Sequence, residues 1–113
     1  MERSLAMKKR QFKLAEIFGT FLAEGSRAAA FRVGNLEQSL AANEAVVLDF
    51  AGVRNINDSF ANALIVPLIE IHGDGVLERL KFVNCNGIVR VMIDGALSLG
   101  MERSQTSRPG ASL

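Results

Sequence analysis

The chain has 113 residues, 49% of them hydrophobic, and a formal net charge of +1 at pH 7. This length is typical of one compact domain that buries roughly two-thirds of the surface its unfolded chain exposes. The balance of 13 basic and 12 acidic residues argues against a nucleic-acid binder that works by bulk electrostatic attraction. Cys85 is the one cysteine, which excludes an intrachain disulfide, so we expect a protein of a reducing compartment, the cytoplasm.

The two ends of the chain differ from the part between them. The basic cluster within residues 1–10 is followed by a segment that Lys13 and Glu16 make too charged for a secretion signal. No apolar run approaches the length that spans a membrane. Residues 101–113 lack apolar periodicity and end in a stretch rich in Ser, Pro and Gly. We therefore expect a flexible basic lead over 1–10, a folded domain over 11–100 and a flexible tail over 101–113.

The folded part opens with a pattern of strand and turn. From Gln11 to Phe18 the side chains alternate with a period of two, which indicates a strand. A turn should follow from Gly19 to Gly25, with a short second strand inside it at Thr20 to Ala23.

A first helix is expected after this turn. Ser26 has a side chain that is favoured at a helix N-cap. The apolar stripe that follows consists of Ala30, Val33, Leu36 (or Glu37) and Leu40. Gly34 and Asn35 lie within this stripe and should weaken or interrupt the helix.

The middle of the chain predicts a central strand and a second helix. Ala45 to Phe50 is a β-branched run that is apolar on both faces up to Asp49, which is typical of a strand covered by helices. The second helix opens at Asp58 and Ser59. Its expected buried stripe is Phe60, Leu64, Leu68 and Ile71. Pro67 lies within it and lacks a backbone donor, so the helix should kink there or stop early.

A third strand and a third helix complete the pattern. Leu80 to Asn84 reads as the strand, and from Asn86 the helix carries a stripe of Val89, Ile93 and Leu97. Alternating strands and helices indicate an α/β layer fold, and helical crossovers make the later strands parallel. We expect a single small α/β domain with a mostly parallel central sheet and helices packed on it.

Polar residues gather where these strands end. They are Asp49, Asn57, Asp58, Ser59, Asn84 and Asn86. Functional groups in parallel sheets collect beyond the carboxyl ends of the strands. We therefore expect these residues to meet at one rim of the sheet and to form the candidate site.

The segment VVLDFAGVRNINDSFANALI (residues 46–65) resembles the core motif of the STAS superfamily, the fold of bacterial anti-sigma factor antagonists. That motif has a hydrophobic strand ending in Asp and an apolar residue, then a small residue, Gly and Val, and then a loop entering a helix at Asp-Ser. Val46–Phe50, Ala51–Val53 and Asp58–Ser59 match these elements in turn. The Ser-Phe-Ala run at 59–61 and the later FVNCNGIVRVMI are most similar to the short STAS-like family of unassigned function. The resemblance covers about Gln11 to Leu99.

The resemblance implies a regulatory binding protein in a signalling pathway. In such antagonists the serine at the helix start is phosphorylated by a serine kinase of the histidine-kinase-like ATPase fold, and phosphorylation releases that partner. Ser59 is then the regulated residue. The expected partner-binding residues are Asp49, Asn57, Asp58, Phe60, Asn84 and Asn86. We expect no cofactor, no metal, no nucleic acid and no membrane, and a homodimer is possible.

Simpler roles remain open for each of these residues. Ser59 can be an ordinary helix cap, and Asp58 a cap or a first-turn charge. Asn84 and Asn86 can be turn residues that tie the strand to the helix. Phe60 stands where the usual antagonists have a small residue, and it can contact a partner or point into the core. Cys85 reads more simply as a small buried hydrophobe than as a reactive thiol.

Two other classes of protein compete with the switch. Ser59, His72 and an aspartate suggest a hydrolase, but about 13 helical steps of ~1.5 Å would separate the first two by close to 20 Å. A nucleophile and its base need hydrogen-bond reach, ~3 Å, and the chain has no glycine fingerprint for phosphate. We therefore expect no enzyme. The other class is a structural or self-associating interaction module without a phosphorylation switch.

Overall fold

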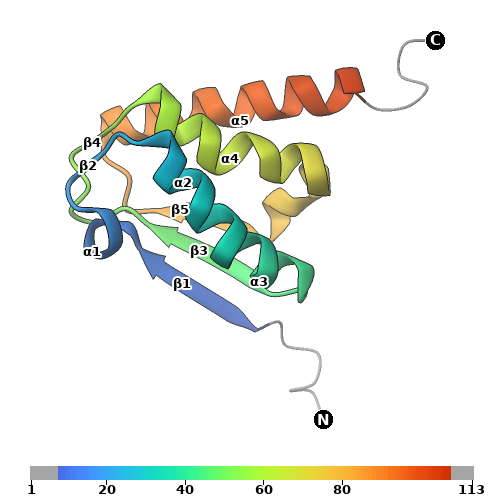
Figure 1. Ribbon diagram of the computed structural model, residues 1–113, viewed down its shortest axis with the longest axis horizontal. Helices are drawn as coiled ribbons and strands as arrows, with labels where there is room; N and C mark the ends of the chain where they lie inside the picture. Colours follow the sequence, from blue (N-terminus) through green and yellow to red (C-terminus); the bar gives the residue numbers. More distant parts are fainter. Residues whose placement is uncertain (1–7, 108–113) are drawn as a thin grey trace.

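The computed structural model describes residues 8–107, which form an α/β domain with short connections (Figure 1). Its elements in chain order are β1 (Lys9–Lys13), α1 (Leu14–Phe18), β2 (Phe21–Leu22), α2 (Gly25–Phe31), the π-helical turn η2 (Arg32–Leu36), α3 (Glu37–Ala41), β3 (Ala45–Asp49), β4 (Asn55–Ile56), α4 (Asp58–His72), the 3₁₀ turn η3 (Asp74–Glu78), β5 (Leu80–Val83) and α5 (Gly87–Ser107). The expected single α/β domain is confirmed. None of the helices within residues 8–107 combines the length and apolar character that a bilayer crossing requires.

The main sheet is parallel and has three strands in the order β1-β3-β5. Lys13 lies beside Asp49 in the register of β1 and β3, and Asp49 lies beside Val83 in the register of β3 and β5. The expected central strand is therefore confirmed as β3. A separate pair, β2 and β4, is also parallel and joins Phe21–Leu22 to Asn55–Ile56 near the carboxyl ends of the main strands.

Helices α2, α3, α4 and α5 all lie on the same side of this sheet (Figure 1). Side chains alternate between the faces of a strand. Val46 and Leu48 point toward the helices and are fully buried, whereas Val47 points to the other face and is only half-buried. Helices therefore cover β3 on one face in the described part of the chain, because every long crossover passes on one side.

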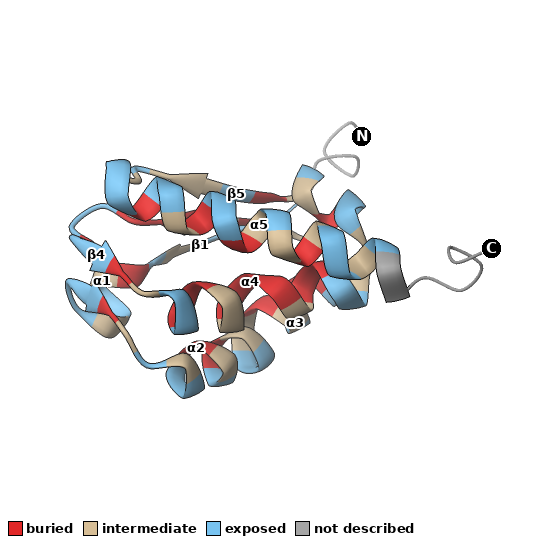
Figure 2. Cartoon of the chain, turned by 90° about the horizontal axis from the view of Figure 1, so that it is seen from above, coloured by how far each residue is buried: buried red, intermediate tan, exposed pale blue. Residues whose placement is uncertain are grey.

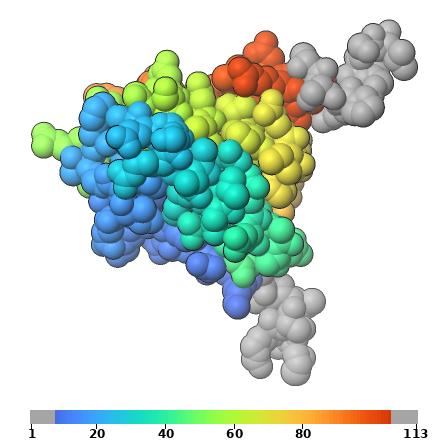
Figure 3. Space-filling model, viewed as in Figure 1, coloured from blue at the N-terminus to red at the C-terminus, as the bar shows by residue number. Residues whose placement is uncertain are grey.

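The core lies between the sheet and a helix layer in which α4 runs between α2 and α5 (Figure 2). In the space-filling view, α2, η2 and α3 cover the front of the molecule and β1 forms its lower edge (Figure 3). Edge-to-face aromatic contacts join the two layers. The ring pairs and their centroid distances are Phe12–Phe31 at 5.3 Å, Phe18–Phe31 at 5.4 Å and Phe18–Phe60 at 5.0 Å.

The predicted strand from Gln11 to Phe18 is correct only as far as Lys13. Leu14–Phe18 forms the short helix α1 instead. Residues 14 and 18 share a face both in a strand, where the period is two, and in a helix, where they are i and i+4. The alternation therefore could not separate the two. The short strand expected within Thr20 to Ala23 is confirmed as β2.

The first predicted helix differs in its start and in its buried face. It begins at Gly25 with Glu24 at the N-cap position and no side-chain capping bond, so Ser26 is not the cap. Ala30 and Val33 are exposed, and Ala28 and Phe31 hold the buried positions. The interruption expected at Gly34 and Asn35 is the π-helical turn η2. A π turn adds one residue per turn, which moves the buried stripe from Phe31 to Leu36 and then to Leu40.

Helix α4 continues through Pro67 to His72, so the expected early stop is wrong. Proline cannot donate to the carbonyl four residues earlier, which is that of Ala63. Arg32 supplies the missing donor, because its Nε lies 2.9 Å from the Ala63 oxygen. The guanidinium of Arg32 is itself held by the carboxylate of Glu37. A side chain from the π turn therefore compensates for the proline.

The burial of α4 also differs from the predicted stripe near its end. Ile71 is 62% exposed, whereas Ile69 is fully buried. The reason is a second buried face toward α5: a Cβ built on Gly100 would lie 2.8 Å from Ile69 Cδ1, so the two helices meet closely there. Any larger residue at position 100 would require Ile69 to shift.

Helix α5 is longer than expected. Val89 and Ile93 are buried as predicted, and Leu97 is half-buried. The helix continues to Ser107, so the part of the expected flexible tail from 101 to 107 is helical. No proline lies between Gly87, where α5 begins, and Pro109. At the other end β1 begins at Lys9, two residues inside the expected lead, and residues 1–7 and 108–113 lie outside the described part.

Candidate functional site

The carboxyl ends of β1, β3 and β5 lie at the same edge of the sheet, as their parallel order requires. The six polar residues expected there do gather at this edge, and we call them the rim: Asp49, Asn57, Asp58, Ser59, Asn84 and Asn86. Direct bonds link parts of the rim that are far apart in sequence. Asn84 Nδ2, for example, donates to Asp49 Oδ1 over 2.9 Å.

Asp49 is a structural clamp at the end of β3. Its carboxylate accepts hydrogen bonds from Asn84, from the backbone N–H of Ala51 at 2.9 Å and from Gln11 Nε2 at 3.1 Å. The Asn84 bond, followed by the Ala51 and Gln11 bonds and the nearby charge of Lys13, lowers the pKa of Asp49 although burial opposes the shift. The residue is only 7% exposed. It therefore stays ionised and links the end of β3 to Gln11 of β1 and to Asn84 directly after β5.

The Ala-Gly-Val part of the motif forms a tight turn after this clamp. The N–H of Val53 donates to the carbonyl of Phe50 over 3.0 Å. Gly52 has a φ of +86°, which the third position of a type II turn requires. The turn lies against α1, because a Cβ on Gly52 would come within 3.3 Å of Ala15 Cβ. The turn thus fixes the path from β3 to the rim.

Two asparagines cap the helices that leave the rim. Asn57 Oδ1 accepts from the N–H of Phe60 over 2.9 Å at the start of α4, while its Nδ2 donates to Ala23 O. Asn86 Oδ1 accepts from the N–H of Val89 over 2.8 Å at the start of α5, while its Nδ2 donates to carbonyls of the 53–54 segment. Each amide therefore caps a helix and ties it to a neighbouring loop. Asn86 thus has a structural role in the turn, and its exposed side chain leaves the predicted partner contact open.

Ser59 is not a helix cap. Since Asn57 makes the capping bond, Asp58 is a first-turn charge and Ser59 lies one residue further inside α4. Ser59 is exposed. The start of α2 comes close to it, because a Cβ on Gly25 would lie 3.1 Å from the Ser59 carbonyl oxygen. The hydroxyl thus stands at the surface, near the starts of two helices, without a capping role.

Phe60 belongs to the core. It is 1% exposed and its ring packs edge-to-face on Phe18. The expectation that it contacts a partner is therefore replaced by the other alternative, because helix geometry turns residue 60 inward when residue 59 faces solvent. Asn84 adopts a φ of +60°, which asparagine tolerates better than most residues, and this places its amide on Asp49.

A groove that the sequence did not indicate lies between α4 and α5, beside the rim. It has a volume of about 350 Å³. Its lining residues are Asp58, Asn62, Val91, Met92, Gly95, Ala96 and Leu99. Val91 is 68% exposed, and Ile88 on the same helix is 56% exposed. The sequence did contain a signal for an exposed apolar surface here. Both residues are apolar although they lie outside the predicted buried stripe of Val89 and Ile93.

The comparisons agree with this geometry. A family model described as a STAS-like domain of unknown function matches residues 33–90. The chain belongs to this STAS-like family. The matched segment runs from η2 into the first turn of α5 and includes every residue of the rim. No curated protein and no solved structure matches the chain.

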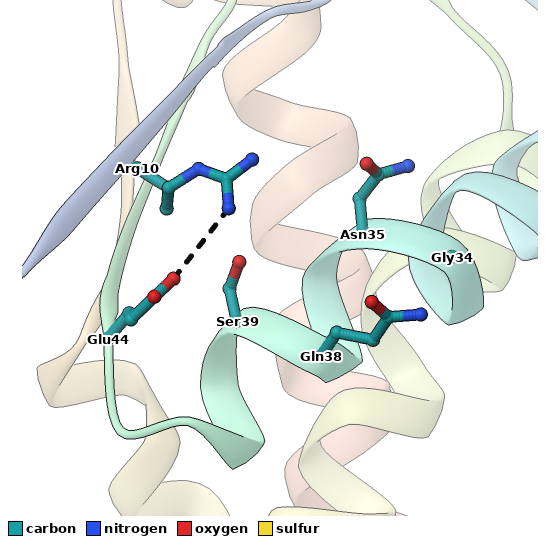
Figure 4. Close-up of a pocket in the computed structure, with 6 residues that line it drawn as sticks. All are labelled: Arg10, Gly34, Asn35, Gln38, Ser39 and Glu44. Carbon is teal, nitrogen blue, oxygen red and sulfur yellow. Dashed lines mark ion pairs between the residues drawn. The ribbon is translucent and has the colours of Figure 1, made fainter.

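The STAS-like domain also has a polar pocket, at the amino ends of the strands (Figure 4). Its volume is about 270 Å³, and it is lined by Arg10, Gly34, Asn35, Gln38, Ser39 and Glu44. Arg10 Nη1 and Glu44 Oε1 are 3.9 Å apart, which is an ion pair but not a hydrogen bond. Glu44 Oε1 is buried and has no hydrogen-bond partner within residues 8–107. The pocket lies away from the rim and does not contribute to it.

Within residues 8–107, Ser59 and His72, the candidate hydrolase pair, do not come together. Ser59 lies in the first turn of α4 and His72 is its last residue, so the length of the helix separates them. Burial raises the pKa of the Cys85 thiol, which disfavours the nucleophilic thiolate. The described rim therefore offers caps, turns and an exposed serine beside an apolar groove.

Proposed function

We propose that this STAS-like domain is a regulatory binding protein that docks a histidine-kinase-like ATPase through the rim and the groove between α4 and α5. Phosphorylation of Ser59 by that ATPase then releases the partner. The proposal is supported by the different roles of two residues at the start of α4. Asn57 caps the helix, and Ser59 stands exposed beside it.

A phosphate on Ser59 would meet a favourable local field. The unpaired amides and partial positive charge of a helix N-terminus stabilise an anion by ~0.3–1 kcal/mol. Because the cap belongs to Asn57, modification of Ser59 would leave the first turn of α4 intact. The domain would therefore keep its fold in both states, and the switch would act at the surface.

The same phosphate would oppose docking. It adds about −1.5 to −2 units of charge at pH 7. This charge would stand next to Asp58, which lines the groove together with the exposed Val91. A partner that buries the apolar groove would then have to desolvate or approach two adjacent negative groups, which weakens the complex.

The test begins with the ATPase that co-purifies with the wild-type chain from its native cell. The purified ATPase is titrated with wild type, Ser59→Ala, Ser59→Asp and Gln105→Asp by calorimetry. Gln105 is also exposed on a helix, but it lies on α5 beyond the residues that line the groove, so it controls for added charge. Ser59→Asp should bind at least tenfold more weakly, a loss of ~1.4 kcal/mol, and the other variants should bind like wild type.

The covalent step has its own readout. The wild-type chain is incubated with the ATPase and ATP, and the peptide spanning Ser59 is examined by mass spectrometry. A phosphoserine at position 59 supports the switch. Equal affinities of all four chains, or an unmodified Ser59 peptide, would reduce the proposal to plain binding.

A self-associating module without a switch is the second candidate. The exposed Ile88 and Val91 favour it, because an apolar patch on a helix can bury itself against a second copy. Val91→Glu would then convert a dimer to a monomer in sedimentation velocity, whereas Ser59→Asp would leave the oligomeric state unchanged.

A further inference from the structure

The main sheet leaves one of its faces without a helix in the described part of the chain. Helices α2 to α5 lie on the other side (Figure 1). All-parallel sheets occur almost only with both faces covered, because their connections place helices on them. A parallel sheet that is bare on one side is therefore an incomplete layer arrangement.

The strand register gives the composition of this open face. Its residues are Lys9, Gln11 and Lys13 from β1, Ala45, Val47 and Asp49 from β3, and Lys81 and Val83 from β5. Neighbouring side chains form rows across the sheet. One row is Gln11–Val47–Lys81 and the next is Lys13–Asp49–Val83.

The open face is cationic around an apolar centre. Three of the chain's four lysines lie on it, and Lys9, Lys13 and Lys81 are all exposed. Its one acidic residue is Asp49, whose carboxylate is already engaged by Gln11, Ala51 and Asn84. Asp49 balances the charge of its neighbour Lys13 in part, whereas Lys9 and Lys81 make no ion pair among the described residues, so the face keeps a net positive charge. Charge complementarity calls for an occupant with carboxylates at its borders and an apolar middle.

The size of the face limits the occupant further. Strands in a sheet lie ~4.8 Å apart, so the two outer strands are separated by roughly 10 Å. That width matches one helix with its side chains, about 10–12 Å across. Five strand residues extend ~17 Å, which equals about 11 helical residues, or three turns.

A second copy of this chain fits poorly on the open face. Two such faces brought together would place lysines against lysines, and like charges at close range oppose association. Nucleic acid also fits poorly, because the half-buried Val47 and Val83 lie where a phosphate row would have to approach.

We propose that the open face docks an acidic amphipathic helix of a partner protein, about three turns long. Its apolar stripe covers Ala45, Val47 and Val83, and its carboxylates pair with Lys9, Lys13 and Lys81. This docking surface is separate from Ser59, which belongs to the helix layer on the other side of the sheet. A partner can therefore hold the domain here whatever the state of the rim.

The test uses a synthetic peptide as the probe, with a side-chain cross-link between positions i and i+4 to keep it helical. It carries a stripe of Leu and Ala bordered by Glu, and a second peptide carries Lys in place of every Glu. Binding to the full chain is measured by fluorescence anisotropy. The Glu peptide should bind, and the Lys peptide should bind at least tenfold more weakly, or by ~1.4 kcal/mol.

Charge reversal in the protein locates the site. Lys81→Glu should weaken the Glu peptide at least tenfold, whereas Lys8→Glu makes the same change in net charge outside the face and should have little effect. Val47→Ser should weaken binding through the apolar centre. Circular dichroism of each variant establishes that the fold is retained. Ser59→Asp should leave the affinity unchanged, which separates this site from the proposed switch.

Several outcomes would overturn the proposal. The first is that the Glu peptide does not bind. The second is that Lys8→Glu and Lys81→Glu lower the affinity for the Glu peptide equally. A third is tighter binding of a short DNA duplex that depends on the same lysines. A fourth is a dimer in sedimentation velocity that Lys81→Glu strengthens, since that would assign the face to a second copy.

Discussion

The helix-covered and open faces of β3 present the same kind of residue to different surroundings. Val46 and Leu48 are fully buried under the helix layer, whereas Val47, between them, is half-buried beside Gln11 and Lys81. All three side chains are aliphatic. The difference therefore comes from what covers each face and not from the hydrophobicity of the strand. An apolar run marks a strand that can be covered twice, but it does not show that it is.

The strongest test of this comparison introduces one charge on each face. Leu48→Asp should prevent folding, because an isolated carboxylate in the core has no partner or water. Val47→Asp should cost only about 1 kcal/mol, since its carboxylate can reach solvent beside Lys81. Urea unfolding followed by circular dichroism measures both. If Val47→Asp also fails to fold, then the open face is covered in the free chain.

Asp49 sharpens the comparison because it points to the open face and is nevertheless buried. Asp49→Asn removes the negative charge and replaces one of the two acceptor oxygens with an amide donor, so at least one of the three hydrogen bonds is lost and the domain should be destabilised by about 1–3 kcal/mol. Because the pKa of Asp49 is lowered in the folded state, the unfolded chain binds its proton first as the pH falls. Its contribution is complete above the unfolded pKa of ~3.9 and is lost below it.

The pH series therefore has a defined sign. Wild-type stability should fall more steeply than that of Asp49→Asn as the pH drops from ~5 to ~3. Asp94→Asn, at an exposed site on α5, serves as the control and should keep the steep wild-type profile. Parallel curves for wild type and Asp49→Asn would mean that the clamp does not hold the carboxylate in its ionised form.

The third prediction concerns the covered side, where Arg32 reaches the carbonyl that Pro67 leaves free. Arg32→Met should cost about 1–2 kcal/mol, because the Ala63 oxygen loses its donor. In the Pro67→Ala background residue 67 has its own N–H, so the cost of Arg32→Met should fall by at least ~0.5 kcal/mol. A double-mutant cycle by urea unfolding measures the coupling. Additive losses would show that the two sites are independent.

The smallest expected change in stability distinguishes two neighbouring rim residues, Asn57 and Ser59. Asn57→Ala removes the cap of α4 and its bond to Ala23 and should cost ~1 kcal/mol or somewhat more. Ser59→Ala should change stability by no more than ~0.5 kcal/mol, since Ser59 is exposed and caps nothing. Thermal unfolding at matched concentration compares them. A larger loss at Ser59 would reverse the assignment of the cap.

The sequence was informative where a local pattern had only one structural solution. The β-branched run before Asp49 predicted the central strand, and the parallel order followed from the helices between strands. That order was enough to bring Asn84 and Asp49 to the same rim. The Asp-Ser pair located the start of α4 correctly within one residue, although it could not show that Asn57, and not Ser59, makes the cap.

The remaining features depended on contacts between distant segments. Leu14 and Phe18 lie on one face with either the strand period or the helix period, so tertiary packing determined that this segment forms helix α1. The step of the buried stripe from Phe31 to Leu36 required the extra residue of the π turn. The exposure of the open face depended on which side every crossover takes. None of these is encoded within a window of a few residues, and the open face in particular is a property of the whole topology.

The bond between Arg32 and the Ala63 carbonyl also constrains the order in which mutations can accumulate. If the proline arose first, the chain would have passed through a form with an unpaired helix carbonyl, at a cost of about 1–3 kcal/mol. An arginine that was already present would have made the same step nearly neutral. Once both are in place, loss of Arg32 costs more stability while Pro67 remains. If the arginine came first, the proline was therefore a tolerated change that afterwards made loss of the arginine more destabilising.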